Sequence, residues 1–489
     1  MKAIGFISFM AFVVLGAAAV WMGSLNQDEG WYLYAANLVA EGRVPYRDFF
    51  FTQGPMMPYV YSCVTKLWAS FGLLGARVFT LVLGAAGIGL SVALSRRLAP
   101  EDRRTEAATM TFLLLGCNLY HLYYLAIPKT YALASLFVAV AFYMLSVARE
   151  RRPWLAALAG LALAFAAGTR ISLGALLATT GLWLAFSRRW KLLTLFAIGG
   201  AAGLGLLYAP FLFDAPSREG LLAAQSYHAA RGGSDIVWTV GSLSRLVRWY
   251  LAVFVAGGMC VFGRLFSTRS LKVDSFCGLL LLGFAAVFAV QMLAPFPYED
   301  YQVPIMGLLS VASAVGFVSL EAGAARAPAL RTLLVLGMVF AGSFGSPLLE
   351  KWSTNGQDRF WSLKKEKYEL AQLKEVAKRI ESLDPGGKEL LTQDLYLAIE
   401  TGRKVPSGLE MGPFSMLSDR EWRTLLSRTD CRIAALSGYT FAIEPPSCKE
   451  RPIDRQMEYW ELLKRNFELV ERHDAFGQNA TPLLVLRHK

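Results

Sequence analysis

The sequence predicts a polytopic helical membrane protein that carries a smaller polar α/β unit at its C-terminal end. The chain of 489 residues is 55% hydrophobic, with a mean hydropathy of +0.39, and only 18% of its residues are charged. Soluble proteins usually carry about 25% charged residues. Apolar blocks recur up to about residue 350, and the composition then becomes polar. We therefore predict a membrane domain over 1–349 and an α/β domain over 350–489.

About eleven segments are long and apolar enough to cross a bilayer, which takes about 20 residues in a helix. The first has one lysine before it and lacks a small-residue cleavage site, so we expect a retained helix rather than a signal peptide. The predicted spans are roughly 3–23, 73–94, 106–122, 129–148, 153–168, 171–187, 191–213, 246–263, 274–294, 302–320 and 328–348.

Positive charge alternates between the connections. Arginine and lysine cluster near residues 96–104, 149–152, 188–191, 264–272 and 326–331. The other connections, 24–72, 119–128, 214–245 and 295–301, are poorer in positive charge. Because cytoplasmic connections collect lysine and arginine, the N-terminus is predicted to be cytoplasmic and the α/β domain to lie outside. The same clustering explains the net charge of +12, so we expect no nucleic-acid partner.

The first outer connection contains two expected helices. Apolar and aromatic residues from Trp31 to Val39 recur at helical spacing, and Gly42 followed by Pro45 ends that helix. A second aromatic segment runs over 55–71. We expect both helices to lie in the membrane interface. The connection 214–245 contains a Gly-Gly pair and is predicted to be a mobile lid.

The C-terminal domain is expected to hold a three-stranded sheet. Strand-like runs cover "ELLTQ", 431–436 and 482–486, and a helix is expected over 455–466. Ser418 and Glu421 have the spacing of a capping box. Cys431 and Cys448 share this polar region, so the two can pair in an oxidising compartment.

Asp28 and Glu29 directly follow the first apolar run, at the membrane boundary. Two interpretations stay open on position alone. The acids can simply favour the N-terminus of the following helix. Alternatively, a carboxylate held in a partly dry cleft can act as a general base.

The region around this acidic pair resembles the GT-C superfamily of polytopic glycosyltransferases, which use a polyprenyl-phosphate sugar. The resemblance rests on the acidic pair, "EGRVPYRDF", a Gly-Pro and "FGLLGARVFTLVLGAAG", and it returns at "PYEDYQVPIMGLL" and "LLTQDLYLAIETGRKVP". It covers the first four spans and is loose over the next four. Within this superfamily, the sequence pattern is similar to those of protein O-mannosyltransferases and the lipid A aminoarabinose transferase.

The resemblance implies an inverting glycosyltransferase of a bacterial inner membrane, with a periplasmic C-terminal domain. Asp28 would be the base that deprotonates the acceptor hydroxyl, and Glu29 would assist it or orient a neighbour. The donor would be a polyprenyl-phosphate monosaccharide from the membrane lipid, and the acceptor a glycan, lipid or protein. Relatives often carry a further acid in the second outer connection, where this chain has only His121. We therefore expect no metal and no cofactor.

Cations near the acidic pair are candidates for binding the donor phosphate, because lysine and arginine pair with phosphate oxygens. Lys129 is the first candidate, although a lysine at an interface can also extend its ammonium to water. Arg47 and Arg43 are further candidates, and both can equally be surface charges. Arg170 lies at an apolar hinge, and its sequence position does not favour a phosphate-binding role over a structural one.

A substrate cavity is expected to include Tyr46 and Asp48 of the first connection. The segment "PFPYEDYQVPI" adds Tyr298, Glu299, Asp300 and Tyr301 to it. Relatives often place a basic residue before the tyrosine, where this chain has two acids. This second acidic group is predicted to face the same cavity as Asp28.

Two other classes of function stay open. A transporter or flippase of lipid-linked sugars would carry charged residues near span midpoints or broken helices in repeated halves. A non-catalytic assembly subunit would use its outer domain to bind a partner.

Overall fold

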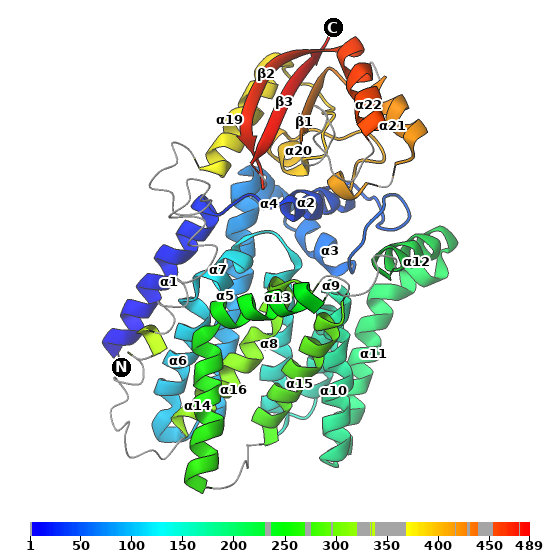
Figure 1. The fold of residues 1–489 in the computed structure, drawn as a ribbon. Helices are drawn as coiled ribbons and strands as arrows, with labels where there is room; N and C mark the ends of the chain where they lie inside the picture. Colours follow the sequence, from blue (N-terminus) through cyan, green and yellow to red (C-terminus); the bar gives the residue numbers. More distant parts are fainter. Residues whose placement is uncertain are drawn as a thin grey trace.

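A computed structural model describes most of the chain as a helical bundle with an α/β unit at one end (Figure 1). The predicted domain boundary, most of the span 328–348 and Cys448 lie outside the described residues. The described residues are 2–229, 236–268, 275–294, 297–319, 333, 335–337, 368–415, 417–427, 431–438, 453–478 and 480–489.

Long apolar helices form the bundle. In the described part of the chain, six are long and apolar enough to cross a membrane, or seven if a pair bent by 84° counts as one span. This makes the chain a multi-pass helical membrane protein; the total of eleven spans stays a prediction. The bundle helices are α1 (Lys2–Met22), α5 (Gly72–Leu98), α6 (Arg104–Gly116), α7 (Leu119–Ala126), α8 (Thr130–Ala148), α9 (Leu155–Thr169), α10 (Gly174–Phe186), α11 (Trp190–Phe213), α14 (Leu251–Thr268), α15 (Ser275–Met292) and α16 (Met306–Val318).

Two predicted connections have more structure than expected. The predicted span 106–122 is broken at Cys117, between α6 and α7. The connection 214–245 contains α12 (Ala215–Ala229) and the start of α13 (Ile236–Trp249), while its Gly-Gly pair lies outside the described residues, so the lid stays a prediction. Helix α13 lies across the bundle and forms the 84° bend with α14. Short 3₁₀ segments complete the membrane domain: η1 (Glu101–Arg103), η2 (Ile171–Leu173) and η3 (Glu299–Ile305).

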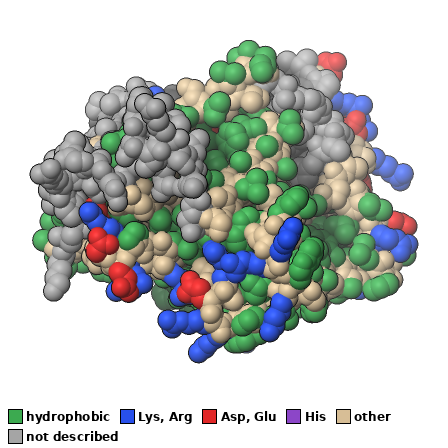
Figure 2. Space-filling model, turned by 90° about the horizontal axis from the view of Figure 1, so that it is seen from below, with side chains coloured by type: hydrophobic (Ala, Val, Ile, Leu, Met, Phe, Trp, Pro, Cys, Tyr) green, Lys and Arg blue, Asp and Glu red, His purple; other side chains and the backbone are tan. Residues whose placement is uncertain are grey.

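The basic connections near residues 96–104, 149–152 and 188–191, which the structure describes, lie at the end of the bundle opposite the α/β unit. Helix α5 begins against that unit, where Glu400 accepts a hydrogen bond from the backbone N–H of Leu73, and it ends at Arg96 and Arg97. Helix α8 runs in the same direction and ends at Arg149. Figure 2 shows lysine and arginine side chains on this far face. The structure therefore agrees with the predicted alternation of charge along the chain.

The first connection forms a layer between the bundle and the α/β unit. It contains α2 (Gln27–Ala40), α3 (Met56–Ser62) and α4 (Thr65–Ala69). Helix α2 ends where predicted, since Gly42 adopts a φ of +85°. Most residues of α2 from Trp31 to Leu38 are buried by protein, so the helix has no broad face open to solvent. Its position in the membrane interface stays a prediction. Helix α20 of the α/β unit packs against α2 (Figure 1).

The C-terminal unit is built on a three-stranded antiparallel sheet in the order β1-β3-β2. The strands are β1 (Ile433–Ser437), β2 (Phe467–Phe476) and β3 (Thr481–His488). The expected third strand "ELLTQ" is wrong, because residues 389 and 391 form only isolated bridges and 467–476 supplies the strand. The helices are α19 (Glu369–Leu383), α20 (Leu395–Thr401), η4 (Gly412–Phe414), α21 (Asp419–Leu426) and α22 (Ile453–Asn466). The predicted capping box of Ser418 and Glu421 is present at α21.

The α/β unit and α2 share one hydrophobic core. Buried side chains of α2, such as Trp31 and Leu33, belong to the same cluster as Leu395 of α20 and Leu484 of β3. At Gly30 the backbones touch, because a Cβ atom there would lie 2.5 Å from the backbone nitrogen of Tyr396. The segment after the first span is therefore fixed between two domains.

Candidate active site

Asp28 lies in the first turn of α2, at the point where the chain leaves the first membrane helix. Asn26 is the N-cap, and its side chain accepts a hydrogen bond from the backbone N–H of Asp28 at 3.0 Å. Glu29 completes a capping box by accepting from the backbone N–H of Asn26. The Trp31 indole donates to Asp28 Oδ1 at 3.1 Å. The cap therefore fixes the backbone of Asp28, and its side chain keeps 27% of its surface exposed.

Lys129 joins Asp28 to the second acidic segment. It is the N-cap residue of α8, and its Nζ lies 2.8 Å from Asp28 Oδ2 and 3.3 Å from Asp300 Oδ2. Tyr131 also donates to Asp300 Oδ2, at 2.8 Å. Three segments far apart in the sequence thus meet at one buried ammonium. We call Asp28, Lys129 and Asp300 the acid–lysine cluster.

Arg170 supplies a second, half-buried cation beside this cluster. Its guanidinium lies 4.8 Å from the ring centre of Tyr131 and 4.7 Å from that of Tyr301. It also donates to Thr130 Oγ1 at 3.0 Å. A planar guanidinium between two aromatic faces is held by cation–π attraction. Its Nε has no partner in the described part of the chain, so the group keeps an unused donor.

The charges of the cluster favour the ammonium form of Lys129. The carboxylates of Asp28 and Asp300 lie 2.8 Å and 3.3 Å from its Nζ and stabilise the positive charge there. Tyr32 lies near the same charges, and burial raises the pKa of its phenol above the usual value, so it stays neutral. The site therefore holds two fixed cations and two carboxylates, with neutral phenols around them.

Glu29 has entirely different partners from its neighbour. Its side chain is 0% exposed and forms two hydrogen bonds with Arg77 of α5, each at 2.7 Å. Arg77 also donates to the carbonyl oxygens of Val20, Gly23 and Ser24 at the end of α1. This pair ties three elements together inside the protein, and Glu29 lies outside the acid–lysine cluster.

Three predicted residues of the first connection, Tyr46, Arg47 and Asp48, line a different hollow. Arg47 pairs with Asp48, and Arg43 lies 3.5 Å from Glu410 of the α/β unit. Tyr46 is buried against Phe211 of α11. Their hollow has a volume of about 410 Å³ and is bounded on the other side by residues 407–421. The structure therefore does not bring these four residues to Asp28.

The second predicted segment is divided in the same way. Asp300 and Tyr301 face the cluster, as described above. Glu299 accepts hydrogen bonds from Ser242 at 2.8 Å and Arg245 at 3.1 Å, both on α13. Tyr298 is 40% exposed and packs edge-on against the ring of Tyr301. Glu299 thus anchors the crossing helix α13 next to the site.

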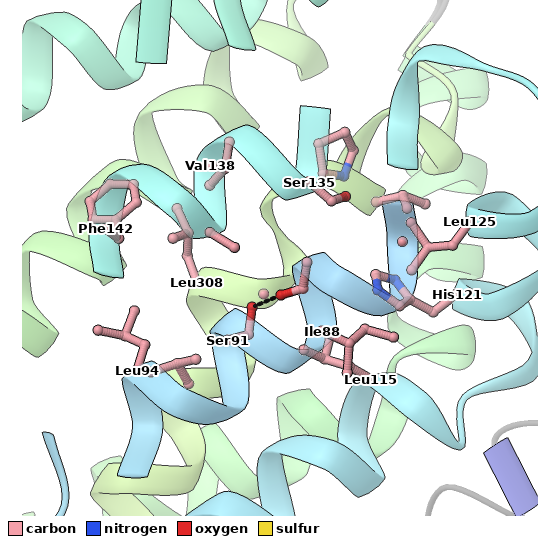
Figure 3. Close-up of a pocket in the computed structure, with 17 residues that line it drawn as sticks. Ile88, Ser91, Leu94, Leu115, His121, Leu125, Ser135, Val138, Phe142 and Leu308 are labelled. Atoms are coloured by element: carbon pink, nitrogen blue, oxygen red, sulfur yellow. Dashed lines mark hydrogen bonds between the residues drawn. The ribbon is translucent and has the colours of Figure 1, made fainter. Parts of the chain in front are cut away.

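His121 lies deeper in the bundle. Its Nδ1 is 2.8 Å from the hydroxyl of Tyr250. It borders a hollow of about 20 Å³, room for one water molecule, between α5, α7, α8 and α16. In Figure 3, Ser91 and Ser135 are the polar side chains labelled besides His121, and the other labelled side chains are apolar. This hollow is too small for a sugar, so His121 has the surroundings of a structural residue.

Comparisons with known proteins identify the architecture. No protein-family model and no curated protein sequence matches the chain. Among solved structures, it resembles ArnT from Cupriavidus metallidurans bound to undecaprenyl phosphate, with a TM-score of 0.65 and 13% identity over 99% of this chain and 97% of that one. It also resembles the oligosaccharyltransferase of Archaeoglobus fulgidus in complex with zinc and sulfate, with a TM-score of 0.56 and 12% identity over 96% of this chain and 72% of that one. Both are GT-C proteins.

The chain has the GT-C fold. Within this fold, Asp28 lies just after the first membrane helix and under the C-terminal unit. A further match, archaeal AglB in complex with an inhibitory peptide and a dolichol-phosphate, has a TM-score of 0.51 and 12% identity over 88% of this chain and 69% of that one.

One of these GT-C structures contains zinc, so we asked whether the present side chains suit a metal. Among the described residues, no group of three or more histidine, cysteine, aspartate or glutamate side chains gathers. Asp28 and Asp300 do face one another, but the ammonium of Lys129 lies between them. A divalent cation would have to displace a fixed charge of the protein, so this donor set does not fit a metal. The expectation of no cofactor stays a prediction.

Three members of the site were not selected from the sequence. Thr130 and Tyr131 directly follow Lys129, so their position next to a candidate phosphate-binding residue could have identified them. The sequence showed Arg170 as a cation at an apolar hinge but did not indicate its function. Its position between two apolar helices was the stronger signal, because an ionisable residue at membrane depth usually has a partner and a function.

Proposed function

We propose that this GT-C chain is an inverting glycosyltransferase that moves a monosaccharide from a polyprenyl-phosphate donor to an acceptor hydroxyl. The observation that carries the proposal is the acid–lysine cluster with Arg170 beside it. One carboxylate, Asp28, is partly exposed, and two cations are held within contact of the same small region. A base and a phosphate site are the two parts that such a transfer requires.

Asp28 is the base in this proposal. The acceptor oxygen attacks the anomeric carbon and forms the new glycosidic bond. The bond from that carbon to the phosphate oxygen breaks, and the electron pair leaves with the lipid phosphate. The acceptor proton passes to Asp28. A phosphate is a good leaving group, so one base suffices and no strong general acid is needed.

Lys129 and Arg170 would stabilise the departing phosphate, where negative charge increases during the reaction. In the described structure the ammonium of Lys129 is shared by Asp28 and Asp300. A donor phosphate attracts the same ammonium and draws it from Asp28. The carboxylate then becomes a stronger base only when a donor is in place. Acceptor deprotonation would then depend on a bound donor.

The structural neighbours support the class of donor. ArnT is described in complex with undecaprenyl phosphate and AglB in complex with a dolichol-phosphate, and both ligands are polyprenyl phosphates. The basic far face of the bundle supports an orientation with that face in the cytoplasm. The acid–lysine cluster and the α/β unit would then lie on the periplasmic side of a bacterial inner membrane.

The test compares glycans of cells that lack the chain with glycans of cells that carry it. Wild-type protein should add one sugar mass, and Asp28→Asn should reduce transfer by a factor on the order of 10³. Glu41→Gln is the matched control, because it changes a carboxylate at the other end of α2 and should leave transfer unchanged. Both variants should reach the membrane in equal amounts.

Full transfer by Asp28→Asn would refute the proposal. A second experiment, with the protein in lipid vesicles, distinguishes a glycosyltransferase from a flippase of lipid-linked sugars. A flippase would move the donor across the bilayer without changing the acceptor mass, whereas a transferase changes that mass and releases polyprenyl phosphate.

A further inference from the structure

The residues around Asp28 are held by the C-terminal unit to an unusual degree. We call Leu25–Gly30 the Asp28 turn. The backbone N–H of Leu25 donates to Glu369 Oε2 at 2.7 Å, and the backbone N–H of Gln27 donates to Gln478 Oε1 at 2.8 Å. Both acceptors belong to the α/β unit, more than 340 residues away in sequence. The unit therefore fixes the backbone immediately before Asp28.

The side chain of Gln27 extends this contact into the interior of the α/β unit. Its Nε2 donates to Asp394 Oδ1 at 2.6 Å and to the hydroxyl of Tyr396 at 3.2 Å. Tyr396 in turn donates to Asp394 at 3.0 Å. All three side chains are buried, with 3% exposure at most. Bonds of an amide to a buried carboxylate are strong and directional.

The other side of the turn is closed by contact with a backbone. A Cβ atom on Gly30 would lie 2.5 Å from the Tyr396 nitrogen and 2.8 Å from the Leu395 carbonyl carbon. The turn therefore cannot shift toward the α/β unit, and the hydrogen bonds prevent it from shifting away. Asp28 is the residue of the turn whose side chain faces Lys129.

We infer that Gln27 and Asp394 are positioning residues: through them the α/β unit fixes the distance between the Asp28 carboxylate and Lys129. This inference rests on the proposed function, because it assigns the role of the unit in the same reaction. Neither residue touches the reacting atoms. The C-terminal unit is then part of the catalytic apparatus.

The physical reason lies in the precision that catalysis requires. A displacement of about 1 Å at a catalytic group can cost on the order of 100-fold in rate. The Oε1 atom of Gln27 has no hydrogen-bond partner in the part of the chain that the structure describes. The two bonds of Nε2 to Asp394 and Tyr396 therefore set the direction of this side chain.

The experiment replaces Gln27 by a side chain of similar length that cannot donate. In full-length protein in membranes, Gln27→Met should reduce kcat by a factor on the order of 10 to 100, with the donor KM changed by less than about three-fold. Asp394→Asn should retain most activity, because its carbonyl oxygen can still accept both hydrogen bonds. Asp394→Leu should reproduce the loss of Gln27→Met.

The matched control is Lys404→Met. Lys404 contacts the same helix α2 from the same unit, 2.7 Å from Glu41, but this pair is exposed at the far end of the helix. We expect wild-type kcat and KM. Hydrogen exchange gives a second readout that needs no sugar: backbone amides of 25–30 should exchange faster in Gln27→Met than in Lys404→Met.

Unchanged kcat and unchanged exchange in Gln27→Met would overturn the inference. A fall in thermal stability with normal kcat per folded molecule would also overturn it, by showing a structural role alone. If Asp394→Leu fails to fold, Gln27→Met still decides the question. Active Asp28→Asn would refute the proposed function itself, whereas inactive Asp28→Asn with fully active Gln27→Met refutes only the positioning role.

Discussion

Asp28 and Glu29 are neighbours in the sequence, yet their carboxylates lie in two different kinds of environment. Asp28 is 27% exposed and shares the ammonium of Lys129 with a second acid. Glu29 is 0% exposed and forms its ion pair with a single guanidinium, that of Arg77. Successive residues of a helix point about 100° apart, so a single step along α2 changes the region that a side chain enters. A catalytic group needs access, whereas a structural ion pair is stable only when all of its hydrogen bonds are made.

The largest expected effect is on the enclosed pair. Arg77→Met leaves Glu29 as a buried carboxylate without its cation and should destabilise the protein by about 3–5 kcal/mol. Thermal unfolding in detergent, together with the amount of folded protein in membranes, measures this loss. Adding Glu29→Gln should recover part of the stability, because it removes the unpaired charge. A stable Arg77→Met single variant would show that Glu29 reaches water and that the contrast with Asp28 is false.

The second largest effect is expected for Lys129, the cation that contacts Asp28, and it should be a loss of activity. Lys129→Met removes the proposed phosphate ligand and should lower kcat/KM for the donor by a factor on the order of 10² to 10³. Stability should fall much less than in Arg77→Met, because Asp28 is partly exposed and Tyr131 still donates to Asp300. Sugar transfer and unfolding are measured on the same preparations. Equal losses of stability in the two variants would show that both pairs are structural.

The smallest effect is expected at the exposed pair of Arg47 and Asp48. The hydrogen bond from Arg47 lowers the pKa of Asp48 to about 2, and the backbone N–H of Val44 adds to this shift. Asp48→Asn should cost less than about 1 kcal/mol, as is usual for surface pairs.

The pH dependence of this third pair has a definite sign. A lowered pKa contributes stability at pH values above the unfolded value near 4, and that contribution disappears as pH falls through about 2. The difference in unfolding free energy between wild type and Asp48→Asn should therefore shrink between pH 4 and pH 2. A large loss of sugar transfer in Asp48→Asn would restore this residue to the substrate cavity in which the sequence placed it.

Parts of the site were accessible from local signals. An acidic pair at the end of the first apolar run identified Asp28, and a lysine before an apolar helix identified Lys129. The second acidic segment contributed Asp300, as its position in the family pattern suggested. Gly42 ended α2 as expected, because its positive φ is a local property of glycine.

Other parts had no local signal. Glu29 and Arg77 lie 48 residues apart and Gln27 and Asp394 lie 367 apart, and only the folded chain brings each pair into contact. Arg43 and Arg47 lie as close in sequence to Asp28 as any cation, yet Arg47 lines another hollow and Arg43 lies against Glu410. The third strand was misplaced because "ELLTQ" has strand composition but pairs only at isolated positions, while the charged segment 467–476 forms the long edge strand.

The sequence by itself determined the membrane class, the alternation of basic connections and the presence of an acid at the end of the first membrane helix. These follow from composition and from periodicity, which act over a few residues at a time. The tertiary structure alone decided which acid has access to solvent, which cation it meets and which domain holds its turn. The reason is that hydrogen bonds and burial depend on distance in space, and a chain of this length brings distant residues together only when its helices pack.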